Sequence, residues 1–97
     1  MYATISTAQL KPHCLAAFRQ RWCTAMEPAI NQLPALVDLY VLLNPESGTL
    51  LVCRIYASEA DALAAGANGA DQQWVEQSAD LVQVETVTHS GYMIIST

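Results

Sequence analysis

Two successive segments of the chain are apolar at almost every position, and a short turn joins them. Residues 36–43 are Leu-Val-Asp-Leu-Tyr-Val-Leu-Leu, and residues 49–56 are Thr-Leu-Leu-Val-Cys-Arg-Ile-Tyr. The Asn-Pro-Glu-Ser-Gly between them favours a turn, because proline presets φ at a central position and glycine accepts positive φ. The sequence therefore predicts a hairpin whose two strands are apolar on both faces.

A strand and a long helix are expected before this hairpin. Residues 2–8 alternate β-branched with small side chains, which is typical of a strand. Pro28 lacks a backbone donor inside the following helix, so we expect a kink or a division near residues 24–27, and Pro34 marks the end. Large apolar side chains recur at helical spacing along one face of that helix: Leu15, Phe18, Trp22, Met26 and Ile30.

Two helical pieces and a last strand follow the hairpin. Ser58 with Asp61 resembles a capping box that opens a short alanine-rich helix, which Gly66 ends. Residues 71–79 form the second piece, and residues 81–88 a strand that residues 91–95 extend past a bend. This βαββαβ order predicts one α+β domain over residues 1–97, ferredoxin-like, with a four-stranded antiparallel sheet and helices on one face.

Helices on one face leave the other face of the sheet bare, although both hairpin strands are apolar there. The chain has 97 residues, of which 53% are hydrophobic and 13% are charged. That is more apolar surface than a small monomer readily hides. We therefore expect a homodimer in which two copies meet through their sheet faces.

Charge and cysteine spacing argue against several function classes. All four basic residues lie in residues 1–54, and the net charge is −5, so a footprint for nucleic acid is missing. No apolar run is long enough for a membrane span, and no signal peptide is visible. The spacing of Cys14, Cys23 and Cys53 gives no CxxC pair, which favours reduced thiols in a cytoplasmic protein. With neither a metal-ligand cluster nor a phosphate loop in the sequence, we predict that no metal or cofactor is needed.

Residues 33–63 resemble a known family, the dimeric α+β barrels, and within them the antibiotic-biosynthesis-type monooxygenase domains. Pro34 at a helix end, Tyr40 in an apolar strand, the turn at residues 44–48 and the Ala57-Ser58-Glu59-Ala60 segment carry this resemblance. It implies a homodimer whose two sheets form a barrel, with a pocket between sheet and helices in each subunit. It also implies, as in some relatives, oxidation of polycyclic aromatic substrates with oxygen and no cofactor.

Other members of that family degrade haem. The resemblance implies that they use an asparagine on the first strand together with a histidine and a tryptophan on the later helices. At the matching places this chain has Thr4 and Ser6 on its first strand, and Trp74 without a histidine on its later helices.

Four aromatic side chains are the candidate ligand-binding residues. Trp22 and Trp74 are either core residues or surfaces on which a flat organic molecule stacks. Tyr40 and Tyr56 lie in the hairpin strands, where a buried phenol needs a hydrogen-bond partner and a ligand oxygen would serve.

Asp38 and Arg54 are each the only charge in an apolar strand. A three-residue turn would place them directly opposite each other, whereas a four-residue turn would point them to opposite faces. An unpartnered charge is costly to bury, so we expect an ion pair, with an anion-binding Arg54 in a pocket as the alternative.

His89 is the candidate catalytic residue, because it is the one titratable group on the last strand that could act as a base near neutral pH. In a cofactor-independent monooxygenase, His89 or a tyrosine would deprotonate a phenol, and the substrate would supply electrons to oxygen. The alternative from another class is a non-catalytic ligand-binding or structural dimer. If side chains fill the space between Trp22, Trp74 and the sheet, the enzyme hypothesis loses its site.

Overall fold

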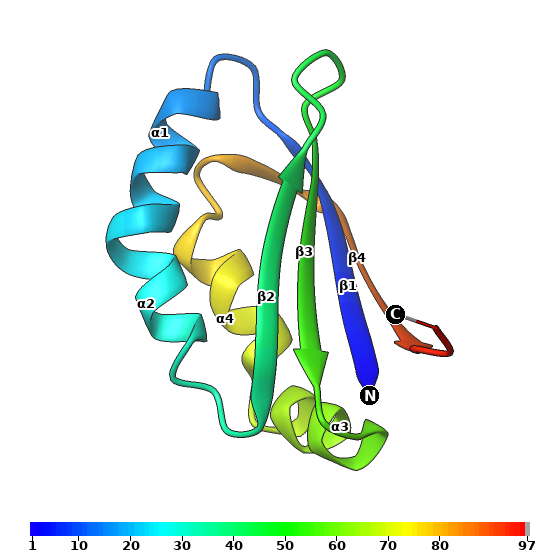
Figure 1. The fold of residues 1–97 in the computed structure, drawn as a ribbon. Coiled ribbons are helices and arrows are strands. Elements are labelled where there is room, and N and C mark those ends of the chain that lie inside the picture. The colour runs from blue at the N-terminus through cyan, green and yellow to red at the C-terminus, as the bar shows by residue number, and fades with distance from the viewer. Residues whose placement is uncertain (97) are drawn as a thin grey trace.

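The computed structural model describes residues 1–96 of the chain. Four antiparallel strands form one sheet, in the spatial order β2-β3-β1-β4, and the helices lie on one of its faces (Figure 1). The strands are β1 (Tyr2–Leu10), β2 (Leu36–Leu43), β3 (Thr49–Tyr56) and β4 (Val82–Met93). The predicted ferredoxin-like βαββαβ order is therefore confirmed.

The first helical region consists of three consecutive pieces. They are α1 (Leu15–Arg21), the π-helical turn η1 (Trp22–Met26) and α2 (Glu27–Ile30). The backbone N–H of Glu27 donates to the carbonyl of Trp22, five residues earlier. A widened turn directly before Pro28 is one way to absorb a residue that has no N–H and whose ring crowds the preceding turn. The expected division near residues 24–27 is confirmed.

The second helical region consists of α3 (Glu59–Ala67) and α4 (Ala70–Gln77). The Ser58 hydroxyl accepts a hydrogen bond from the Asp61 N–H at 3.1 Å, so the predicted cap is present. Gly66 lies within α3 rather than after it, and Gly69, at φ +86°, separates the two helices instead. The last strand continues through residue 88 without the bend that we expected.

The hairpin has the predicted strand bounds but not the favoured register. Asn44 donates its N–H to Thr49, so four residues close the turn, with the last of them, Gly48, at φ +73°. Leu39 consequently lies opposite Arg54, and Asp38 lies opposite Ile55. The expected Asp38–Arg54 pair is wrong, because one additional turn residue moves every side chain of the partner strand to the other face.

The two faces of the sheet differ sharply in burial. Leu50 and Val52 of β3 are at most 1% exposed beneath the helices. On the opposite face no helix covers the strands, and Tyr40 and Leu42 of β2 are 50% and 53% exposed. The bare apolar face that the sequence predicted is thus present, and among residues 1–96 no helix is long and apolar enough to cross a membrane.

Candidate functional site

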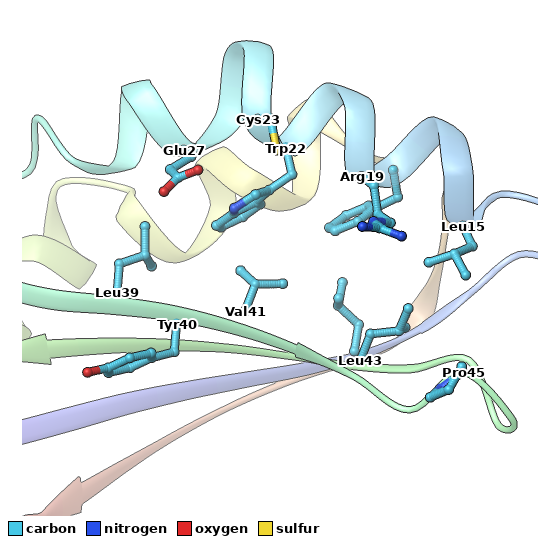
Figure 2. A pocket seen from close by; sticks show the side chains of 12 residues that line it. Leu15, Arg19, Trp22, Cys23, Glu27, Leu39, Tyr40, Val41, Leu43 and Pro45 are labelled. Carbon is cyan, nitrogen blue, oxygen red and sulfur yellow. The ribbon is translucent and has the colours of Figure 1, made fainter.

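A cavity of about 500 Å³ lies between the first helical region and the hairpin (Figure 2). Trp22 projects from the helix toward the sheet, and Leu39 and Val41 project from β2 toward the helix. The main apolar lining consists of Phe18, Trp22, Leu39, Val41, Leu43 and Leu50. We call this space the Trp22 cavity.

The position of β2 at the edge of the sheet explains why this space is open. Helix-facing residues of β3 are fully covered, whereas Leu39, Val41 and Leu43 of β2 are only partly buried. The helical region that stands over β2 carries the widened turn at Trp22, and its side chains face those of β2 across this space. Phe18 and Trp22 stack with ring centroids 6.1 Å apart and planes 21° apart, and both line the cavity.

Charged groups from α1 and α2 stand at the mouth of the Trp22 cavity. Arg19 and Glu27 both line it and are exposed to solvent. A guanidinium can bind an anionic substituent of a ligand, and a carboxylate can accept a proton or a hydrogen bond. The mouth therefore offers groups of both signs above an apolar floor.

Tyr40 also borders this cavity, but from the bare side of β2 (Figure 2). Its hydroxyl donates to the Asp38 carboxylate at 2.6 Å, and the Leu39 N–H donates to the same carboxylate at 2.9 Å. These two hydrogen bonds, the tyrosine's first, lower the pKa of Asp38 below its ordinary value. The hydrogen bond to Asp38 raises the pKa of Tyr40 in turn, so this phenol is a weak candidate for a general base.

A second cavity, of about 320 Å³, lies on the same, helix-covered face of the sheet but toward its β4 edge. It is enclosed by the second helical region and strands β1 and β4. We call it the α3–α4 cavity. Thr4, Asp71 and His89 are among the residues that line it. Beside it, Arg54 is 1% exposed and pairs with the Asp71 carboxylate. Arg54 thus has a carboxylate partner, contributed by α4 rather than by the neighbouring strand.

The structure separates the residues that the sequence suggested for one site. Trp22 and Tyr40 border the Trp22 cavity, whereas His89 lines the α3–α4 cavity. Tyr56 is 1% exposed in the core beneath α3, where burial raises its pKa. Trp74 is completely buried and does not line the Trp22 cavity.

Phe18 and Asp71 were not predicted from the sequence as site residues, and Ser6 was named only for its place on the first strand. Phe18 belongs to the same apolar stripe as Trp22, and its four-residue spacing could have indicated the stacked pair. Asp71 and Ser6 carry no such signal, because their partners lie 17 and 83 residues away along the chain. In residues 1–96, no group of three or more His, Cys, Asp or Glu side chains is placed to hold a metal ion.

Comparison with known proteins gives matches in structure only. No protein-family model matches the sequence, and no curated protein matches it. A solved structure of a proposed antibiotic biosynthesis monooxygenase from Nitrosomonas europaea is 22% identical and has a TM-score of 0.73, over 99% of this chain and 100% of that one. A similarly described protein from Bordetella bronchiseptica is 12% identical with a TM-score of 0.77, over 98% and 97% of the two chains.

A third solved structure widens the set of neighbours. It is an ethyl tert-butyl ether d (EthD) family protein from Bacillus halodurans, 14% identical with a TM-score of 0.71, over 98% of this chain and 100% of that one. The chain therefore has the ferredoxin-like α+β fold that these proteins share. The resemblance to antibiotic-biosynthesis-type monooxygenase domains is confirmed at the level of the fold.

Proposed function

We propose that this protein is a homodimer that binds a flat, largely apolar organic molecule in the Trp22 cavity of each subunit. The observation that carries the proposal is the cavity of about 500 Å³, with one wall formed by the stacked Phe18 and Trp22 rings. Small-molecule sites are typically apolar and aromatic spaces of this size with a few placed polar groups. Arg19 and Glu27 at the mouth are those polar groups.

The shape and charge of the cavity define the ligand class. A fused-ring molecule would lie between the Trp22 indole and the side chains of Leu39 and Val41, which point at each other across the space (Figure 2). A sulfonate, carboxylate or phenolate on its rim would pair with Arg19. A molecule with a polar group at one edge and a flat apolar body therefore suits this cavity.

The bare sheet face supports the homodimer part of the proposal. Large apolar side chains on that face are about half exposed, Tyr40 and Leu42 among them, and Leu51 and Ile55 lie beside them in the register. A second copy presents the same apolar strands, so the two faces bury each other without any additional protein. Light scattering at micromolar concentration is expected to give twice the 10.5 kDa chain mass, and a stable monomer would contradict this part.

Calorimetric titration with anthraquinone-2-sulfonate tests the ligand part. Val41→Phe fills the cavity from the β2 side and is expected to weaken binding at least ten-fold. Val84→Phe adds the same atoms at an exposed position of β4, away from the cavity, and is expected to leave binding unchanged. Equal affinities of the two variants, or no binding to the native protein, would refute the assignment.

The names of the structural neighbours favour a second candidate function, cofactor-independent oxygenation of that ligand. A 1,8-dihydroxyanthrone would lose a proton to Glu27 and give electrons to oxygen, so that its CH₂ group becomes a carbonyl and one water leaves. Oxygen uptake in the presence of a chelator, above that with heat-denatured protein, is the expected result. If the ligand binds but no oxygen is taken up, the non-catalytic dimer is favoured. If the His89→Ala variant loses oxygen uptake, the reaction belongs to the α3–α4 cavity instead.

A further inference from the structure

A chain of buried polar contacts ends at the α3–α4 cavity. Arg54 pairs with Asp71 and also donates from Nη2 to the Ser6 hydroxyl at 3.2 Å. Ser6 Oγ in turn lies 2.6 Å from Nδ1 of His89. Ser6 is completely buried and Arg54 is nearly so, whereas His89 is exposed in the cavity lining. Three strands and α4 thus cooperate to hold one imidazole ring.

The direction of these hydrogen bonds fixes the proton on that ring. A guanidinium only donates, so Ser6 Oγ accepts from Arg54. Among residues 1–96, Nδ1 of His89 is then the one acceptor within reach of the Ser6 hydroxyl proton. A neutral imidazole that accepts at Nδ1 carries its hydrogen at Nε2. A proton at Nδ1 would leave the buried Ser6 hydroxyl without an acceptor.

We propose that the α3–α4 cavity is a second binding site, separate from the Trp22 cavity, which takes a small uncharged molecule through a carbonyl oxygen hydrogen-bonded to Nε2–H of His89. His89 is then a hydrogen-bond donor rather than the base that the sequence suggested. The Arg54 and Asp71 charges offset each other, so the site favours a ligand without net charge.

The lining of the cavity extends this description of the ligand. Ala62, Leu63 and Ala67 of α3 form an apolar wall that suits a small ring or short alkyl group. Thr4 Oγ1, a buried oxygen in the lining, has no hydrogen-bond partner among residues 1–96 and is free to accept a ligand N–H or O–H. A primary amide attached to a small ring has both an N–H that can donate to Thr4 Oγ1 and a carbonyl oxygen that can accept from His89.

Benzamide is a probe of that class, and ¹⁵N NMR of the imidazole rings reads the site directly. His13→Gln assigns the His89 signals, because the chain has two histidines. We expect the Nε2–H tautomer at His89, and a saturable shift of its Nε2 signal on adding benzamide. Ser6→Ala is expected to mix the tautomers and to weaken benzamide roughly five-fold, the effect of one hydrogen bond.

Two comparisons separate this site from the proposed function. Val41→Phe fills the Trp22 cavity and is expected to leave benzamide binding unchanged, whereas His89→Phe removes the donor and is expected to abolish it. Benzoate has the same ring but a negative charge, and its affinity is expected to be at least ten-fold lower. A predominant Nδ1–H tautomer, benzoate binding as well as benzamide, or no shift of His89 with benzamide would each overturn the proposal.

Discussion

Asp71→Asn should destabilise the fold far more than Arg54→Met, although both substitutions break the same ion pair. Arg54 is 1% exposed, and Asp71 provides its one carboxylate partner among residues 1–96. Nε and Nη1 of Arg54 have no hydrogen-bond partner in the same range. Removing the Asp71 charge therefore leaves a buried cation without compensation, whereas removing Arg54 leaves a carboxylate that is 32% exposed to water.

The expected magnitudes follow from this difference in burial. Breaking a fully buried pair from one side costs about 3–5 kcal/mol, and the partial exposure of Asp71 lowers our expectation to about 2–3 kcal/mol. Arg54→Met replaces a desolvated charge by an apolar chain of similar length, so its cost should stay below about 1 kcal/mol. In the double variant Arg54→Met/Asp71→Asn, the Asp71 substitution should add less than about 0.5 kcal/mol to the cost of Arg54→Met alone.

Urea denaturation of the three variants at one fixed protein concentration measures these differences. With a slope of about 1.5 kcal/mol per molar, Asp71→Asn should lower the midpoint by about 1.3–2 M. The double variant should be less destabilised than Asp71→Asn alone. An Asp71→Asn midpoint within about 0.3 M of the native one, or a larger loss for Arg54→Met, would refute the reasoning about the buried charge.

Three further predictions concern the bare face and its edge. Leu51→Asp puts a charge on that face and should give a monomer in light scattering at micromolar concentration, whereas Leu63→Asp, on exposed α3, should not. Burial raises the pKa of the Cys53 thiol, so its alkylation, followed by mass spectrometry, should be slow at neutral pH and accelerate as the pH rises through that raised value. Tyr40→Phe removes the main cause of the lowered pKa of Asp38, which should move toward its ordinary value in a ¹³C NMR titration. Because the pKa of Asp38 is lower in the folded state, its carboxylate stabilises the fold at pH values above its unfolded pKa. This stabilisation is lost as the pH falls through the folded pKa, and Tyr40→Phe should reduce this pH dependence of stability.

The fold was largely predictable because its signals are local. The apolar stripe through Trp22, the proline at position 28 and the turn at residues 44–48 each act within a few residues, and each gave the expected element. The hairpin register was not predictable, because three- and four-residue turns share the same sequence signals. That single residue decides whether Arg54 faces Asp38 or α4.

The candidate sites were predictable only in part for the same reason. Trp22 lines a cavity because its side of the helix faces the sheet. The helical spacing of the apolar residues predicts that orientation. Ser6 meets His89 because β1 pairs with β4 in one particular register, across 83 residues of sequence. The sequence carries no local signal for such a contact, nor for the open space that an edge strand leaves below a widened helical turn.

A crystal structure of the protein with anthraquinone-2-sulfonate tests the central claim most directly. We predict that the ring system lies in the Trp22 cavity, stacked on Trp22, above Val41 and with its sulfonate at Arg19. Ring density confined to the α3–α4 cavity or to the bare face of the sheet would contradict it. So would a Trp22 cavity closed by its own side chains in the crystal.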